Sequence, residues 1–445
     1  MRDFARSDHE GVQAQLDRLG ALSVPDGRLG LETIRALLDR LGNPHRRLPP
    51  VFHIAGTNGK GSTCAFLRAM LEADGYAVHV TTSPHLVRYN ERIRVAGTLI
   101  EDDRLAALLA EVLDAGEDLN PSFFEVTIAA AFTEFARVPA DACVVEVGLG
   151  GRFDATNVLE PDVLAACGIA ALGIDHERFL LAPEDGVPTE PIARIAFEKA
   201  GIAKAGVPLV TLAERYDYPA EASAVIRAVA EGKGSPLFER GSDWGAKPVG
   251  RGAHPPFEDD LSVAYADDLG HFHIRDIAMR GRHQALNVGL ATAMIRHQSK
   301  LRVSEDAITR GAASARWPAR LQRLSPGALT GTREVWLDGG HNPSAGDTLA
   351  AHFEGRRMHL VLGMLSAKDP AALTGPLAGS IETVTVVPVP GHDWHGVDAF
   401  GPGAKEADTL TDAMASLPED GLPVLIAGSL YLAGEALRLN GEMPD

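Results

Sequence analysis

The sequence predicts an α/β fold with two domains. A P-loop (phosphate-loop) domain with a mostly parallel sheet is expected over residues 1–297, and a smaller Rossmann-like α/β domain over residues 298–445. Three observations lead to this prediction. Short apolar runs alternate with helical patterns along the chain, 445 residues exceed one ordinary domain, and the glycine-rich segment VFHIAGTNGKGST at 51–63 joins an apolar run to a helical one.

Composition limits the compartment and the partners. The chain has 42 Lys and Arg against 60 Asp and Glu, a formal charge of −18, which argues against nucleic acid or an anionic membrane as the main partner. Cys64, Cys143 and Cys167 are scattered without metal-binding spacing. The N-terminal segment is too charged for a secretory signal, and no apolar run reaches the roughly 18 residues of a membrane span. We expect a cytoplasmic protein that binds small molecules.

The first strong signal follows a helical pattern at 29–42. Residues 51–55 are an apolar strand, and the residues after Gly61 have helical spacing. Gly56, Gly59 and Gly61 let the backbone approach an oligophosphate, with N–H groups and a helix N-terminus pointing at it, and Lys60 adds a positive charge. The pattern predicts strand, phosphate loop and helix.

The spacing of this loop is unusual. Only Thr57 and Asn58 separate the first two glycines, and Gly61 intervenes before Ser62, so the loop departs from the common G-x-x-x-x-G-K-[ST] motif. An ordinary glycine-rich turn between strand and helix remains the alternative.

A second strand, 76–82, leads into the arginine-rich segment SPHLVRYNERIRV at 83–95. Those arginines form either a solvated face or ligand groups, and their place directly after a strand favours the second interpretation. Helices are expected at 99–115 and at 122–136, the latter apolar enough to be buried.

The second strong signal is a carboxylate at the end of an apolar strand. Residues 142–145 are apolar, Glu146 follows, and Gly148, Gly150 and Gly151 come next. A buried carboxylate is costly unless it is paired or bound to a metal. In a nucleotide-binding protein Mg²⁺, held by carboxylates, hydroxyls and phosphates, is the expected partner.

A further strand at 163–169 precedes Asp175 and His176, and a helix after residue 191 ends near Lys199. His176 is either structural or a metal or phosphate group. Lys199 needs no function if it only faces the C-terminal end of its helix dipole. Periodicity does not decide between these alternatives.

The rest of the first domain has weaker signals. A helix and a short strand are expected at 220–240, a glycine- and proline-rich loop at 241–256, and a hairpin strand at 271–277. A helix with Asn287 near its start should end the domain by residue 298.

The second domain repeats the strand and helix alternation. A strand at 334–337 ends in a polar tip of Asp338, His341 and Asn342, and later apolar runs complete an open parallel sheet of four to six strands. His392 and His395 could suggest a metal, but no further ligand lies nearby in the sequence.

Eight segments in chain order resemble the folylpolyglutamate synthase and dihydrofolate synthase family of the Mur ligase superfamily, over about residues 30–429. They are AGTNGKGST, TSPHLVRYNERIRV, FFEVTIAAAF, VVEVGLGGRFDATNV, FEKAGI, GRHQALN, WPARLQ and LDGGHNP. The resemblance implies an ATP-dependent amide ligase that joins L-glutamate to dihydropteroate and to reduced folates through an acyl phosphate. Such chemistry needs positioning and charge neutralisation rather than a protein nucleophile.

The bifunctional bacterial type is the leading interpretation. The alternatives are an enzyme that only extends glutamate chains, a Mur-type cell-wall peptide ligase, and a non-catalytic ATP-binding switch. A monomer is expected, because the two domains of one chain suffice for the site.

The resemblance also implies roles for single residues. The nucleotide is expected at Gly56, Thr57, Asn58, Gly59, Lys60, Gly61, Ser62, Asn287, Arg320 and Asp338. Two magnesium ions are expected at Ser83, Glu146, His176 and Lys199. The pterin substrate is expected at Gly30, Ser122, Phe124, Asp154, Ala155 and Thr156, and catalytic roles at Lys60, His176, Lys199 and His341, the last near ATP and glutamate.

In the family the lysine that matches Lys199 is carbamylated, and its carbamate helps to position magnesium. Capture of CO₂ requires a neutral amine, so the site must lower the lysine pKa.

Three features depart from the family pattern. Gly340 stands where alanine is usual and Ala319 where glycine is usual, two small-for-small changes that we expect to be tolerated. The segment LAPEDGVPTEP at 181–191 looks longer than usual and lies next to the expected metal site.

Overall fold

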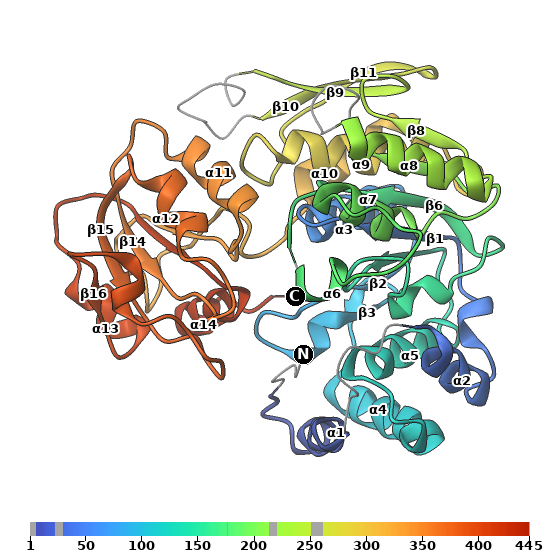
Figure 1. Ribbon diagram of the computed structural model, residues 1–445, viewed down its shortest axis with the longest axis horizontal. Helices are drawn as coiled ribbons and strands as arrows, with labels where there is room; N and C mark the ends of the chain where they lie inside the picture. The colour runs from blue at the N-terminus through green and yellow to red at the C-terminus, as the bar shows by residue number, and fades with distance from the viewer. Residues whose placement is uncertain (1–5, 23–29, 176, 213–219, 251–260, 445) are drawn as a thin grey trace. The chain divides into compact units, whose positions relative to one another are not determined.

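The structure is a computed structural model that describes residues 6–22, 30–175, 177–212, 220–250 and 261–444. The chain forms two compact units (Figure 1). The larger unit takes in Met1–Pro248, Ser262–Ile277 and Ala285–Ala315, and the smaller unit takes in Ala278–Gln284 and Arg316–Asp445. Each unit is a layered α/β structure, as the alternation of apolar and helical patterns predicts.

The larger unit is built on a mostly parallel sheet. Within the described residues its eight strands have the order β4-β3-β2-β5-β1-β6-β7-β8. Their bounds are β1 (Val51–Ala55), β2 (Val78–Thr81), β3 (Ile93–Val95), β4 (Thr98–Leu99), β5 (Ala142–Glu146), β6 (Leu164–Ile169), β7 (Leu209–Thr211) and β8 (Leu237–Glu239). The strand predicted at 51–55 is confirmed, and β3 and β4 are the antiparallel members at one edge.

Strand β1 lies where the sheet order reverses. The chain leaves β1 for β2, returns to form β5 between them, and then builds β6 on the other side of β1. In open α/β sheets, ligands bind outside the carboxyl ends of the strands at such a switch point. The predicted phosphate loop occupies this position.

Helices cover the sheet. They are α1 (Glu10–Ala21), α2 (Glu32–Arg40), α3 (Lys60–Ala73), α4 (Asp102–Gly116), α5 (Phe123–Phe135), α6 (Glu177–Leu180), α7 (Pro191–Ala200), α8 (Ala220–Lys233), α9 (Gln284–Arg296) and α10 (Glu305–Ser314), with 3₁₀ turns η1 (Pro44–Arg46), η2 (Tyr89–Arg92), η3 (Glu117–Leu119) and η4 (Ala155–Val158). One apolar core joins alternate residues of the central strands, including Val51 and Ala55, to α4, α5 and α7. Within the described ranges, no helix combines the length and apolar character that a membrane span requires.

Helix α5 shows how local sequence sets an element. The Ser122 hydroxyl accepts a hydrogen bond from the Glu125 N–H at 3.2 Å, and the Glu125 carboxylate accepts one from the Ser122 N–H at 2.7 Å. This capping box starts the helix, and residues from Val126 to Phe135 are buried. The prediction of a buried helix is confirmed. The helix predicted from Leu99 is wrong at its start, because Thr98–Leu99 pairs with β3 and α4 begins at Asp102.

A small antiparallel sheet contains β9 (Trp244–Val249), β10 (Ser262–Asp267) and β11 (Gly270–Ile274), in the order β11-β10-β9. The hairpin strand predicted at 271–277 corresponds to β11. The loop predicted at 241–256 is wrong at 244–249, because Trp244 is buried and its ring stacks on Tyr265 of β10. Residues 251–256 lie outside the described residues.

The smaller unit has its own sheet. Its six described strands have the order β12-β13-β17-β14-β15-β16, with bounds β12 (Gln322–Arg323), β13 (Val335–Leu337), β14 (Met358–Leu362), β15 (Ile381–Val386), β16 (Lys405–Glu406) and β17 (Val424–Ala427). Its helical elements are α11 (Pro343–His352), α12 (Ala371–Leu377), η6 (Val397–Phe400), α13 (Leu410–Ser416) and α14 (Leu430–Asn440). The predicted parallel sheet is wrong at one edge, where β12 pairs antiparallel with β13.

The larger unit continues past the boundary expected at residue 298, through α10. Helix α10 packs on α3, the helix that follows the phosphate loop. A Cβ at Gly311 would lie 2.4 Å from the Met70 Cα, so the two helices approach each other through a glycine. The Arg310 guanidinium also donates to the Ala73 carbonyl at 2.8 Å. These contacts explain why α10 belongs to the compact unit of the phosphate loop.

Gly311→Ala should destabilise the larger unit. A methyl group there meets backbone atoms of α3, which cannot rotate away, and such overpacking costs about 1–3 kcal/mol. Gly20→Ala is the control, because Gly20 is an exposed residue of α1 and a Cβ there would have no heavy atom within 4 Å. Alanine there should be neutral or add up to about 1 kcal/mol. Denaturant unfolding followed by circular dichroism measures the free energy of unfolding of both variants. Equal changes in the two variants would contradict the close approach of α3 and α10.

Candidate active site

The phosphate loop has two positions that disfavour any side chain. Gly56 has φ +153°, and a Cβ there would lie 2.8 Å from the Ala170 Cβ. Gly59 is the N-cap of α3 with φ +83°, and a Cβ there would lie 2.4 Å from Oδ1 of Asn287. Gly56 therefore requires glycine for conformation and for space, whereas Gly59 requires it for conformation and leaves room for a Cβ only if the Asn287 side chain moves.

The loop is held by the segment that follows β6. The N–H groups of Thr57 and Asn58 donate to the Ala171 carbonyl at 2.8 and 3.1 Å. The Thr57 hydroxyl donates to the Gly173 carbonyl at 2.9 Å and accepts from the Gly173 N–H at 3.1 Å. Helix α3 begins at Lys60, so its first N–H groups have no acceptor within the helix and favour an anion. The backbone at the carboxyl end of β1 is therefore suited to an anion such as a phosphate.

Glu146 and Ser83 meet beside this loop. Glu146 is the last residue of β5, is buried, and lies in register with Ile54 of β1. Its Oε2 accepts a hydrogen bond from the Ser83 N–H at 3.1 Å. Two of the four residues expected to bind magnesium therefore lie together at the ends of neighbouring strands. His176, another of the four, lies outside the described residues.

Lys199 reaches the phosphate loop from α7. Its side chain is buried, and its Nζ donates to the Gly56 carbonyl at 2.9 Å. Burial, and then the positive charge of Lys60, lower the pKa of Lys199 to about 7. The amine is thus placed inside the site rather than on the solvated end of its helix.

A pocket brings these elements together. It encloses about 270 Å³, part of it open to solvent, and is lined by Gly56, Thr57, Lys60, Val147, Gly148, Leu149, Gly150, Asp175, Leu180 and Lys199. The Lys60 Nζ lies 3.4 Å from the Thr57 carbonyl oxygen. The sequence marks Asp175 as polar but assigns it no role. The sequence gives no sign that Leu180 lines the pocket, because this residue has no polar group and only the fold brings it to the pocket.

The residues expected to bind the pterin have structural contacts of their own. Both Asp154 oxygens are engaged: Oδ2 accepts from the Leu149 N–H at 2.8 Å, and Oδ1 accepts from the Thr156 hydroxyl and N–H at 2.5 and 3.0 Å. Burial raises the pKa of Asp154. The Thr156 hydroxyl also contacts His53 Nε2 at 2.8 Å, which links β1 to this turn.

The other expected pterin residues lie on three elements. The Phe124 ring on α5 packs against Gly148, where a Cβ would be 2.5 Å from the ring. Ser122 caps α5, Ala155 opens η4, and Gly30 lies just ahead of α2. The glycine loop after β5 is therefore in contact with both the pocket and Phe124.

In the smaller unit, Asp338 organises the tip of β13. Its Oδ2 accepts from the Leu321 N–H at 2.8 Å and its Oδ1 from the Gly340 N–H at 2.7 Å. Burial raises the pKa of Asp338, and the charge of Arg320 opposes this shift. His341 follows, with Nδ1 3.1 Å from the Gly339 carbonyl oxygen. The structure thus brings Arg320, Asp338 and His341 to one end of the sheet.

The two departures from the family pattern fall in this region. Ala319 has φ +55°, a left-handed conformation that costs an L-residue about 1–2 kcal/mol relative to glycine. A Cβ at Gly340 would lie 2.6 Å from the Ala345 Cβ. At both positions, the choice between glycine and alanine should therefore change the stability of the smaller unit.

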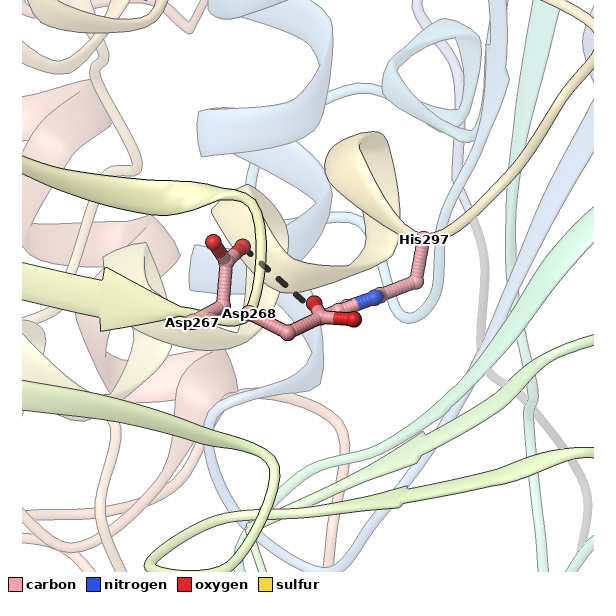
Figure 2. Close-up of side chains that lie close together, drawn as sticks. All are labelled: Asp267, Asp268 and His297. Atoms are coloured by element: carbon pink, nitrogen blue, oxygen red, sulfur yellow. Dashed lines mark ion pairs between the residues drawn. The ribbon is translucent and has the colours of Figure 1, made fainter.

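Among the described residues, one group outside the pocket has ligand atoms close enough together to hold a cation. It consists of Asp267, Asp268 and His297 (Figure 2). The Asp267 carboxylate already accepts two hydrogen bonds from the Arg296 guanidinium, at 2.6 and 2.9 Å, and one from the Tyr265 hydroxyl at 3.0 Å. A carboxylate that neutralises an arginine has little charge left for a metal. We interpret the group as an ion-pair network that holds the β10–β11 hairpin against α9.

The histidines at 392 and 395 have other contacts. His392 stacks on Tyr431 with ring centroids 3.8 Å apart, and His395 Nε2 lies 2.7 Å from the Lys368 carbonyl oxygen. These contacts account for both rings without a metal.

Fold and site together define a phosphate-loop enzyme with a second α/β unit. No family model matches the chain. Among curated proteins, the dihydrofolate synthase/folylpolyglutamate synthase of Bacillus subtilis is 32% identical over 441 residues, 91% of this chain and 94% of that protein. The chain spans about half the length of a Halobacterium salinarum relative, a probable bifunctional folylpolyglutamate synthase/dihydropteroate synthase, with 33% identity over 92% of this chain.

Solved structures similar to this chain belong to the same group of proteins as the relatives found by sequence. FolC from Escherichia coli, in complex with DHPP and ADP, is 30% identical to this chain with a TM-score of 0.82, and the match covers 96% of this chain and 97% of that one. The bifunctional folylpolyglutamate synthase/dihydrofolate synthase of Yersinia pestis, with Mn, AMPPNP and L-glutamate bound, is 27% identical with a TM-score of 0.79, over 96% and 97%. The chain belongs to the dihydrofolate synthase/folylpolyglutamate synthase family.

Gly59→Ala should weaken nucleotide binding at least about tenfold, because the new methyl group displaces Asn287 and strains the start of α3. Gly75→Ala is the matched control: Gly75 has φ +92°, follows the same helix, and has no heavy atom within 4 Å of a Cβ position. That variant should lose about 1 kcal/mol of stability but bind normally. Titration with a fluorescent ATP analogue distinguishes them, and normal binding by Gly59→Ala would contradict the role of this glycine.

Proposed function

We propose that the chain is an ATP-dependent ligase that joins L-glutamate to the carboxylate of dihydropteroate and to that of reduced folates. One observation carries the proposal: Lys60, the N-terminus of α3 and Lys199 converge on one pocket at the carboxyl end of β1, with Glu146 and Ser83 side by side at the ends of the adjacent strands. The names of the relatives support the same activity.

The reaction needs no nucleophile from the protein. A substrate carboxylate oxygen attacks the γ-phosphorus of ATP, and ADP leaves to give an acyl phosphate. The glutamate amine then attacks the acyl carbon, and the phosphate leaves with the former carboxylate oxygen. In this proposal, Lys60 and the first N–H groups of α3 hold the phosphates, and Asn287 supports the loop from α9.

The residues around Glu146 fit a divalent cation. Glu146 is a buried carboxylate beside the phosphate loop, an oxygen donor of the kind that Mg²⁺ prefers. We propose Ser83, Glu146, His176 and modified Lys199 as ligands for two magnesium ions, with support from the manganese in the Yersinia structure. Bound magnesium would neutralise phosphate charge.

We further propose that Lys199 is carbamylated. Its burial, its position 2.9 Å from the Gly56 carbonyl oxygen, and a pKa of about 7 favour a neutral amine that can react with CO₂. The carbamate would then offer anionic oxygens to magnesium.

Roles in substrate binding remain proposals. Arg320 and Asp338 are assigned to the nucleotide and His341 to the ATP and glutamate sites, which agrees with their common place at the tip of β13. Gly30, Ser122, Phe124 and the 154–156 turn are assigned to the pterin. The monomeric state and the cytoplasmic location also remain predictions.

An assay of ADP release with ATP, Mg²⁺ and L-glutamate tests the proposed function. Dihydropteroate and tetrahydrofolate are supplied in turn, and turnover with both is expected. Turnover with tetrahydrofolate alone would support an enzyme that only extends glutamate chains. Silence with both would leave a Mur-type ligase or a nucleotide-binding switch and would overturn the proposal.

Lys60→Ala should lower ATP turnover by about 100-fold or more, because the phosphates lose their charged partner. Ser83→Ala should mainly raise the magnesium concentration needed for half-maximal rate, because Ser83 lies beside Glu146 rather than on the loop. Magnesium titrations of both variants measure this difference. Equal insensitivity of the two variants would refute the division between phosphate and metal residues.

Removal of bicarbonate and CO₂ should lower activity reversibly. With [¹³C]bicarbonate, NMR should detect a carbamate in the wild type and in Lys204→Arg, but none in Lys199→Arg. Lys204 is a suitable control because it is also partly buried and has a lowered pKa. An unmodified Lys199 in an active, metal-loaded preparation would contradict carbamylation.

A further inference from the structure

The segment at 181–190 has no role in the proposed function. It connects α6 to α7, the helix of Lys199. Most of its residues are exposed, yet one side chain, Glu184, makes ion pairs with two arginines of the larger unit.

Those arginines belong to two different elements. Oε1 of Glu184 accepts from Arg152 at 2.9 Å, in the glycine loop after β5. Oε2 of Glu184 accepts from Arg194 of α7 at 2.8 Å and also contacts Arg152 at 2.5 Å. Glu184 therefore bridges the loop and the helix.

Glu198 completes the network. Its carboxylate accepts from Arg152 at 2.8 and 3.2 Å and pairs with Arg194 at 3.0 Å. The side chains of Arg194 and Glu198 are only 5% and 6% exposed. The side chains of Arg152 and Glu184 are 20% and 38% exposed. Glu184 therefore lies at the open edge of a network in which two arginines and two carboxylates balance each other, and its removal leaves an uncompensated positive charge beside the buried pair of Arg194 and Glu198.

The network is connected to the pocket on both sides. The Arg194 Nε donates to the carbonyl of Leu180, a residue that lines the pocket, at 3.1 Å. Glu198 precedes Lys199 on α7, and its carbonyl accepts from the Arg152 N–H at 2.8 Å. Two residues that line the pocket, Leu180 and Lys199, are therefore linked to the two arginines that Glu184 bridges.

We propose that Glu184 is a positioning residue, which bridges Arg152 and Arg194 and so holds the 181–190 segment, Leu180 and the Lys199 end of α7 in the geometry of the phosphate pocket. The kinetic part of this proposal rests on the proposed function. Neither arginine is among the residues that line the pocket, so Glu184 acts on the pocket through these two side chains.

Three variants test the proposal. Glu184→Gln keeps the size of the side chain and removes its charge, and Glu184→Asp keeps the charge on a shorter stem. Asp185→Asn removes a charge from the exposed neighbouring residue and serves as the control. The Gln variant should lower kcat and raise KM for ATP by about tenfold, with KM for L-glutamate within twofold. The Asp variant should recover part of the loss, and Asp185→Asn should match the wild type.

Hydrogen exchange of the ligand-free protein gives a readout that does not depend on turnover. Amides at 177–187 should exchange at least about fivefold faster in Glu184→Gln than in the wild type or in Asp185→Asn. Exchange and kinetics of Glu184→Gln at wild-type values would overturn the proposal, as would a uniform loss of stability with unchanged KM values. If the wild type shows no ligase turnover, the proposed function fails, whereas the exchange result still decides whether Glu184 holds the segment.

Discussion

The close approach of the phosphate loop to its neighbours is the constraint on which the site depends. Side chains are disfavoured at Gly56 by Ala170 and at Gly59 by Asn287. The buried amine of Lys199 reaches the Gly56 carbonyl from α7, at the edge of the same pocket. The sheet order, with β1 between β5 and β6, brings Glu146 beside the same loop. One backbone geometry therefore places a phosphate site, a carboxylate and an amine together.

Charge is balanced locally in a chain with a net charge of −18. Lys60 and Lys199 are two amines in one pocket, and burial together with the Lys60 charge lowers the pKa of Lys199 to about 7. Beside them, the Arg152 and Arg194 guanidinium groups are matched by two glutamates. Lys60, together with the N-terminus of α3, can attract a phosphate locally, whatever the overall charge of the surface.

Local sequence patterns predict many of the helices and strands, whereas the parts of the fold and site that they miss depend on contacts between distant residues. Strand β1, a helix after the glycine loop and the buried α5 follow from apolar runs, glycines and helical spacing. The pairing of Lys199 with Gly56 joins residues 143 positions apart, so helical spacing could not reveal it. Glycines and prolines around β9 indicate a loop, whereas a strand forms there because Trp244 packs on Tyr265 from another segment. The alanine at position 319 gives no sign of its left-handed conformation, and only the family resemblance, with glycine usual there, points to it.

The central claim is that the substrate carboxylate takes the γ-phosphoryl group of ATP and becomes an acyl phosphate, which the glutamate amine then attacks. The most direct measurement uses dihydropteroate with ¹⁸O in both carboxylate oxygens, and follows the label in the released phosphate by mass spectrometry. The acyl phosphate route predicts one ¹⁸O atom in each phosphate formed with the amide product. Unlabelled phosphate, released at the same rate as the amide product, would contradict the account.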